Sequence, residues 1–349
     1  MLVLRGKSLM VDPGESAVDD AKSEAAAREE RIGAGRARAH ELAATSDGAR
    51  IEVFANLGSV SDAVAAVAQG AEGCGLLRTE FLFLDRDSPP GEGEQRTAYQ
   101  QIADTLDGRP LIVRTLDIGA DKPASWLPLE REDNPALGLR GIRLQLARRE
   151  LLETQLRALL GVRSAGPLQI MIPMISALPE LVETRSVLER LATQMDVKAP
   201  ELGIMVETPA AALIADTLAR EAAFFSIGSN DLSQYALARD RTNPAVADGL
   251  DGLDPAVLRL IDSTVRGGNL RSRVTGVCGG LAAIPEAVPI LIGLGVTELS
   301  VPPAAISEIK SLVRALDVGS CRELAAQALA ASDAQAVRRL VQPILEKAA

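Results

Sequence analysis

Eight short apolar segments recur along this chain, and a helical pattern follows each of them. Apolar runs of four to eight residues between turn signals are typical of strands buried on both faces of a parallel sheet. Eight strand–helix units in about 260 residues are typical of a (β/α)8 barrel. The segments span residues 51–57, 73–80, 111–117, 168–173, 202–207, 224–230, 273–278 and 298–301.

An open, doubly wound sheet is the alternative arrangement of alternating strands and helices. Such a sheet usually carries a glycine-rich phosphate loop after its first strand. Here the first strand ends in Asn56-Leu57-Gly58-Ser59, which does not match that loop. We therefore expect an α/β protein with a (β/α)8 TIM barrel and an N-terminal helical connector.

The first 48 residues differ from the rest in composition and in the elements they predict. Residues 2–11 predict two very short strands around Gly6-Lys7, and residues 15–44 are rich in Ala, Glu, Arg and Lys. That composition is typical of a polar helix outside the main core. We expect a remnant hairpin and connector helix over residues 1–48, and the barrel with C-terminal helices over residues 49–349.

Charge and composition argue against several classes of protein. The net charge of −10 and the lack of a Lys/Arg block argue against a nucleic-acid partner. No apolar run approaches the ~20 residues of a membrane span, and the N-terminus does not resemble a signal sequence. Cys74, Cys278 and Cys321 are odd in number and far apart, which favours free thiols in a reducing compartment. We expect a cytoplasmic protein without membrane insertion.

Two carboxylates follow neighbouring apolar runs. Glu207 ends the run that begins at Gly203, and Asp231 ends the run that begins at Phe224. The carboxyl ends of barrel strands share one face, so the two side chains should lie at one rim. Two oxygen ligands at a rim suit Mg²⁺ (magnesium), with water and substrate oxygens filling the other positions. Alternatively, both carboxylates cap the helices that follow them.

Further polar side chains lie at the strand ends and in two long excursions after the third and sixth strands. Arginine matches phosphate and carboxylate oxygens bidentately, so we expect a site for a multiply anionic, metal-chelating small molecule. Alternatively, the arginines pair with neighbouring acids. The strand ends carry Asn56, Arg78, Glu80, Arg114, Asp117 and Asn230, and the excursions carry Lys122, Arg140, Arg143, Arg239 and Arg241.

Cys278 and His40 are the remaining candidates for chemistry. Cys278 ends the seventh strand, where it is either a small buried thiol or an acid that protonates an enolate carbon. His40 is the single histidine. It lies in the polar connector, and we expect a surface side chain with no catalytic role.

Seven stretches together point to a known family. They are GLLRTEFLF (75–83), RTLDIGADK (114–122), NPALGLRGIR (134–143), GIMVETP (203–209), FFSIGSNDLSQY (224–235), ARDR (238–241) and TGVCG (275–279). From about residue 50 to 315 the chain resembles the C-terminal, phosphoenolpyruvate-binding domain of enzyme I of the bacterial sugar phosphotransferase system. The same barrel occurs in pyruvate phosphate dikinase and phosphoenolpyruvate synthase.

The resemblance implies a phosphoenolpyruvate-protein phosphotransferase whose barrel domain forms a homodimer. Glu207 and Asp231 would hold Mg²⁺, and Cys278 would give the proton that turns enolpyruvate into pyruvate. The implied substrate-binding residues are Arg78, Arg114, Asn230 and Arg241, with Arg140 and Lys122 in the phosphate-facing excursion.

Two departures from the family pattern matter. The family usually has Glu after Cys-Gly, where this chain has Gly280. Residues 1–46 resemble only the last strands of the family's histidine domain and its connecting helix, without the loop that carries the phosphorylatable histidine, so we expect a histidine-bearing phosphotransfer domain in trans. The alternatives are a non-catalytic phosphoenolpyruvate sensor and a Mg²⁺-dependent lyase or aldolase that handles a pyruvate enolate.

Overall fold

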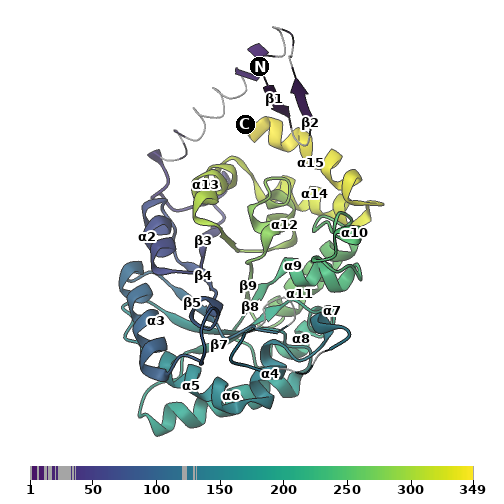
Figure 1. Ribbon diagram of the computed structural model, residues 1–349. Helices are drawn as coiled ribbons and strands as arrows, with labels where there is room; N and C mark the ends of the chain where they lie inside the picture. Colours follow the sequence, from purple (N-terminus) through teal and green to yellow (C-terminus); the bar gives the residue numbers. More distant parts are fainter. Residues whose placement is uncertain are drawn as a thin grey trace.

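The eight predicted strands close into one parallel barrel, which confirms the predicted fold (Figure 1). This is a computed structural model, and it describes residues 2–5, 8–11, 14, 18–19, 21–22, 33, 35, 37–119, 124–128, 130 and 132–348. The barrel strands are β3 (Glu52–Leu57), β4 (Cys74–Leu77), β5 (Leu111–Arg114), β6 (Leu168–Ile172), β7 (Glu201–Val206), β8 (Phe224–Ile227), β9 (Val274–Val277) and β10 (Glu298–Val301). They pair in chain order, and β10 closes the barrel against β3.

Helices separate the strands and surround the barrel, as Figure 1 shows. They are α2 (Val60–Ala68), α3 (Glu92–Leu106), α4 (Gly141–Ala147), α5 (Arg149–Leu160), α6 (Leu178–Gln194), α7 (Pro209–Leu213), α8 (Ala215–Leu218), α9 (Ser229–Ala236), α10 (Pro244–Ala247), α11 (Pro255–Asn269), α12 (Val288–Leu294) and α13 (Ile306–Ala315). Two more follow the barrel, α14 (Val318–Ala330) and α15 (Ala334–Ala348). Short 3-10 turns are η1 (Glu80–Leu82), η2 (Pro135–Leu137), η3 (Gly280–Ala283) and η4 (Pro303–Ala305).

Side-chain caps set where several helices begin. The Thr208 hydroxyl accepts from the backbone N–H of Ala211 at 3.1 Å, and Pro209 occupies the first helical position. Asp254 accepts from the N–H of Ala256 at 2.8 Å in the same way. Each such cap contributes about 1 kcal/mol to helix stability. Because Thr208 directly follows Glu207, its cap also fixes the turn that carries the carboxylate.

Three strands end earlier than the sequence predicts. The second, third and sixth strands stop at Leu77, Arg114 and Ile227 instead of at residues 80, 117 and 230. After Ile227 the chain turns at Gly228 into α9, which places Asn230 and Asp231 in its first turn. Polar and acidic side chains are favoured at a helix N-terminus because they complement its free N–H groups and its dipole.

Apolar side chains fill two separate regions. One large cluster lies between the barrel and its helices and includes Val53, Val113 and Ile204. A smaller cluster includes Ile112, Met205 and Cys278 and is kept apart from the first. Successive side chains along a strand point to opposite faces, so they alternate between the layer under the helices and the barrel interior, as in barrels generally.

The N-terminal hairpin lies outside the barrel (Figure 1). Strands β1 (Leu2–Arg5) and β2 (Ser8–Val11) pair antiparallel, as predicted. The predicted connector helix falls largely on residues outside the described ranges. Within those ranges, no helix is long and apolar enough to cross a membrane.

Candidate active site

A cavity of about 470 Å³ opens at the carboxyl ends of the barrel strands. Side chains that are far apart in the sequence meet on its wall, because every strand of a parallel barrel ends at the same face. The lining residues used below are Arg78, Glu80, Arg114, Glu207, Asn230, Asp231, Arg241 and Cys278.

Glu207 and Asp231 form the acidic side of this cavity. Glu207 is 1% exposed, and its Oε1 accepts a hydrogen bond of 2.7 Å from the N–H of Met174. Burial, followed by the negative charges of Asp231 and Asp117, raises the pKa of Glu207 to about 8. Two carboxylates therefore repel each other at a buried position, and a cation between them would relieve that repulsion.

The residues present fit a Mg²⁺ ion. Both candidate ligands are hard carboxylate oxygens at the edge of an open cavity, where water and substrate oxygens can complete the coordination shell. In the described part of the chain, no group of three or more His, Cys, Asp or Glu side chains is placed to hold a metal. Glu207 and Asp231 are therefore the candidate acidic ligands, and further oxygen atoms would complete the coordination shell.

Arg114 is held in place before any ligand arrives. It forms buried ion pairs with Glu80 and, at 3.3 Å, with Asp117. Burial alone would lower the pKa of Arg114, but the charges of Glu80 and Asp117 raise it above its ordinary value. The sequence left open whether Arg114 pairs with Asp117 or faces a ligand, and the structure shows both because Arg114 also lines the cavity.

Arg140 lies behind the acidic side of the cavity. Its guanidinium contacts Asp117 at 3.0 Å and Asp231 at 3.1 Å, and the residue is 1% exposed. It does not belong to the cavity wall. Arg140 therefore orients Asp231 instead of reaching into the cavity.

Arg78, Asn230 and Arg241 line the more open part. Arg78 is exposed, and no carboxylate among the described residues pairs with it, so the expected alternative pairing with Glu80 does not form. Arg241 contacts Asp231 at 3.4 Å, and Asn230 accepts from the N–H of Gly280 at 3.0 Å. Two guanidinium groups thus stand beside two carboxylates, which suits an anion that also chelates a metal.

The Cys278 thiol lines the same cavity and is 1% exposed. Its Sγ lies 3.6 Å from the backbone oxygen of Ile227. Burial is the main cause that raises the pKa of Cys278, to about 12, while Ser226 and Arg114 lower it. The thiol is therefore protonated at neutral pH and can act as a proton donor.

His40 is exposed and lies away from this cavity. Its backbone adjoins Gly70, in the connection between α2 and β4. That connection is at the amino ends of the strands, opposite the cavity.

Comparison of the sequence with models of known protein families identifies a match. The profile described as "PEP-utilising enzyme, PEP-binding domain" matches residues 34–318. The chain belongs to this family.

Relatives of this PEP-binding domain are similar over nearly the whole chain. A "Multiphosphoryl transfer protein" of Xanthomonas campestris pv. campestris is 48% identical over 95% of this chain and 40% of its own length. Proteins named "Phosphoenolpyruvate-protein phosphotransferase" from Haloferax volcanii and Haemophilus influenzae are 44% and 40% identical over 95% and 96% of this chain, and over 59% of their own lengths. The chain therefore spans 40–59% of these relatives.

The structure brings together most of the residues that the sequence predicts for this PEP-binding domain. Arg78, Arg114, Asn230, Arg241, Glu207, Asp231 and Cys278 share one cavity, whereas Arg140 lies behind it. Lys122 falls outside the described residues. The wall also includes Phe81, Leu84 and Met205, which the sequence did not single out because apolar residues near strand ends look like ordinary core.

Proposed function

We propose that this domain binds phosphoenolpyruvate together with Mg²⁺ and passes its phosphoryl group to a histidine of another domain or chain, releasing pyruvate. One observation carries the proposal: cationic, acidic and thiol side chains meet on the wall of one cavity of about 470 Å³. Phosphoenolpyruvate has a phosphoryl group, a carboxylate and a carbon that must gain a proton. The cavity offers a suitable group for each of these.

Arginine side chains would hold the anionic ends of the substrate. Arg78 and Arg241 stand at the open part of the cavity, and the ion pairs of Arg114 fix its fork in advance. A fixed donor costs no reorganisation when charge develops on the transferred group. Mg²⁺ held by Glu207 and Asp231 would neutralise charge on substrate oxygens.

Cys278 supplies the proton in the second half of the reaction. Once the bond between phosphorus and the enol oxygen breaks, the phosphoryl group moves to the histidine nitrogen and enolpyruvate remains. The Cys278 S–H bond then breaks and its proton adds to C3, which leaves pyruvate and a thiolate. A raised pKa suits this role because the thiol stays protonated until the enolate forms.

The phosphoryl acceptor is proposed to lie outside residues 1–349. The single histidine of the chain, His40, is at the opposite end of the barrel from the cavity. The relatives named phosphotransferase are also longer than the matched part. Both facts support an acceptor on another domain.

The direct test mixes this chain with the isolated histidine domain of a relative, ³²P-labelled phosphoenolpyruvate and Mg²⁺. We expect label on the histidine domain and one pyruvate per label transferred. Tight phosphoenolpyruvate binding without label transfer would contradict the proposal and favour a sensor. Pyruvate formation from an unphosphorylated hydroxy-keto acid would favour a lyase.

A further inference from the structure

The barrel interior beneath Cys278 holds a glycine between two polar side chains. Gly276 on β9 is the register partner of Ser226 on β8 and of Glu298 on β10. Because side chains alternate along a strand, Gly276 and Cys278 face the same side. The missing side chain of Gly276 therefore leaves space directly below the thiol, between a hydroxyl and a carboxyl group.

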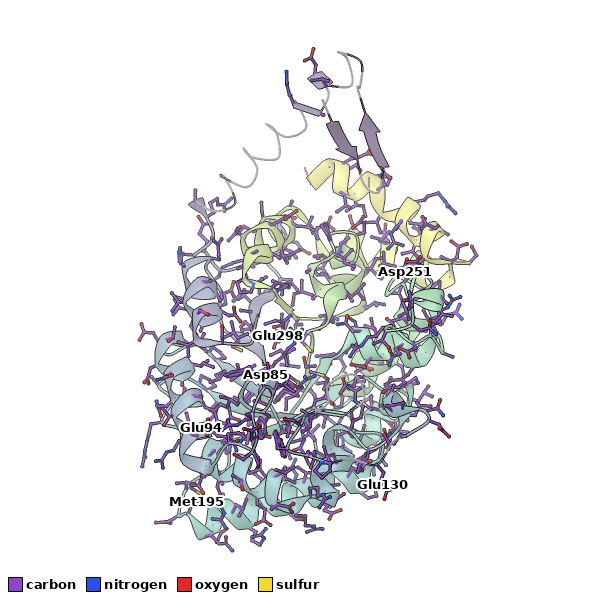
Figure 2. The ribbon with its side chains drawn as sticks, viewed as in Figure 1. Asp85, Glu94, Glu130, Met195, Asp251 and Glu298 are labelled. Atoms are coloured by element: carbon purple, nitrogen blue, oxygen red, sulfur yellow. The ribbon has the colours of Figure 1, made fainter. Side chains whose placement is uncertain are left out.

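Glu298 fills this gap from the side of β10. A Cβ atom on Gly276 would lie 3.0 Å from its carboxyl carbon, and one on Gly75 would lie 2.5 Å from its Oε1. The Glu298 side chain thus reaches its place only because both neighbours are glycine. Figure 2 labels Glu298 near the middle of the molecule, inside the ring of helices.

One buried carboxyl oxygen at this place lacks a hydrogen-bond partner. Glu298 is 5% exposed and Ser226 is 1% exposed. Glu298 Oε1 has no hydrogen-bond partner among the described residues, whereas the Ser226 hydroxyl lies close enough to the Cys278 thiol for a hydrogen bond that lowers the pKa of that thiol. A buried polar atom without a partner costs about 1–3 kcal/mol, and apolar side chains usually fill barrel interiors. Packing alone therefore does not explain why Glu298 and Ser226 occupy the barrel interior. Ordered water is the usual partner of such buried polar groups.

The electrostatic surroundings keep a proton on Glu298. The titratable groups that face it are Glu52 on β3, Cys74 on β4 and Cys278 on β9. Burial, followed by the charge of Glu52, raises the pKa of Glu298 to about 8. Glu52 is only half-buried and is the register partner of Glu298 on β3, so a partly exposed carboxylate stands beside this interior group.

We propose that Glu298 and Ser226 form a proton path that restores the Cys278 thiol from the closed end of the barrel. This inference rests on the proposed function, in which Cys278 protonates enolpyruvate. The product covers the cavity side of the thiol at that moment, so a proton from below can arrive before pyruvate leaves.

The transfer balances as a relay of one proton. Cys278 loses its proton to C3 of enolpyruvate and becomes a thiolate. The Ser226 hydroxyl gives a proton to the thiolate, directly or through water, and takes one from the Glu298 carboxyl group. The resulting carboxylate regains a proton from solvent at the end marked by Glu52. The net change is one proton moved from solvent to the methyl group of pyruvate.

The test follows two reactions of the full chain with Mg²⁺. One is pyruvate formation with the histidine domain, and the other is exchange of pyruvate methyl protons with D₂O, which needs no phosphoryl transfer and is followed by NMR. For Glu298→Gln and Ser226→Ala we expect both rates to fall about tenfold with unchanged KM, less than the 10²–10⁴ typical of a direct proton donor. In Glu298→Gln the change in rate with pH around 8 should become smaller, because one of the two buried carboxyl groups that titrate there, Glu298 and Glu207, is gone.

Thr275→Val is the matched control. Thr275 Oγ1 is also buried without a partner among the described residues, but it faces Gly268 of α11 outside the barrel. This variant should keep wild-type rates. Ser226→Ala, which removes only one hydroxyl, keeps the test decisive if Glu298→Gln does not fold.

The outcomes separate the two proposals. Wild-type rates and pH profiles in both Glu298→Gln and Ser226→Ala, with normal label transfer, overturn the proton path and leave the proposed function standing. A wild-type chain that neither transfers label nor exchanges pyruvate protons overturns both. Equal losses in Thr275→Val would assign the effect to general disturbance of β9 and would also overturn the path.

Discussion

At the scale of single residues, the site combines opposed charges that hold one another in place. Asp231 contacts both Arg140 and Arg241, and Arg114 lies between two acids. Such buried pairs contribute little net stability because desolvation offsets their attraction. Their effect is to fix side chains whose directions decide what the cavity can bind.

Asp231→Asn should abolish Mg²⁺-dependent binding of phosphoenolpyruvate. The amide keeps the shape of the side chain but removes one of the two negative charges available to the metal. Titration calorimetry with and without Mg²⁺ measures the effect, and Asp216→Asn at an exposed site on α8 is the control. Unchanged Mg²⁺-dependent affinity in Asp231→Asn would contradict the assignment.

Glu298→Gln should change how stability depends on pH. The folded pKa of Glu298 is about 8, above its unfolded value of about 4.3, so the folded state holds its proton more tightly. Below about pH 4 both states are protonated and Glu298 adds no penalty, whereas the penalty grows from there and is complete above about pH 8. At pH 9 the unfolding free energy of Glu298→Gln should exceed that of wild type by on the order of a few kcal/mol. At pH 4 this gain should be nearly absent, because Glu298 is then protonated in the folded state and largely protonated in the unfolded state. Urea unfolding at the two pH values measures this, and a pH-independent difference would contradict it.

At the scale of elements, a buried lysine fastens the end of the connector to the barrel. The Lys310 ammonium on α13 donates to the backbone oxygens of Ala39 at 2.5 Å and Gly70 at 3.0 Å, and it pairs with Glu72 at 3.0 Å. Burial, followed by the charges of Arg314 and Arg50, lowers the pKa of Lys310 to about 8. One side chain thus joins α13 to two segments that are distant in the sequence, the end of the connector at Ala39 and the connection between α2 and β4.

Lys310→Met should destabilise the fold by roughly 3–5 kcal/mol, the usual effect of removing one partner from a buried ion pair. It leaves Glu72 and two carbonyl groups without this donor. Chemical denaturation measures the loss, and Lys347→Met at an exposed position is the matched control. A loss no larger than that of the control would show that the buried contacts contribute little.

At the scale of the whole molecule, the barrel separates the face that carries the cavity from the face that meets the connector. Strand carboxyl ends carry the cavity, while Lys310, Gly70 and His40 lie toward the other end. Under the proposed function, a phosphoryl acceptor would therefore approach the cavity from outside the barrel, and the relatives extend well beyond the matched region.

By resemblance to the family, we expect this chain to form a homodimer. Light scattering at micromolar concentration measures its mass. A mass near the 36.7 kDa of one chain would contradict the prediction.

The barrel and most of the cavity wall are predictable from the amino-acid sequence. Apolar runs at regular spacing specify buried parallel strands, and parallel closure brings all strand ends to one face, so Glu207, Asp231 and Cys278 could be grouped before any coordinates. The strand ends themselves were placed up to three residues too late in three strands. Asn230, for example, follows an apolar run in the sequence, but in the structure it belongs to the first turn of α9.

Which charged groups meet depends on the folded barrel and cannot be predicted from the sequence. Arg140 turned out to hold Asp231 from behind the cavity, and Glu298 lies beneath Cys278 although twenty residues separate them in the chain. In the sequence, Glu298 is one acid at the start of an apolar strand. The burial of Glu298, and the lack of a partner for its Oε1 among the described residues, result from the pairing of β10 with β9, where a glycine stands opposite, and this pairing joins strands that are separate in the sequence.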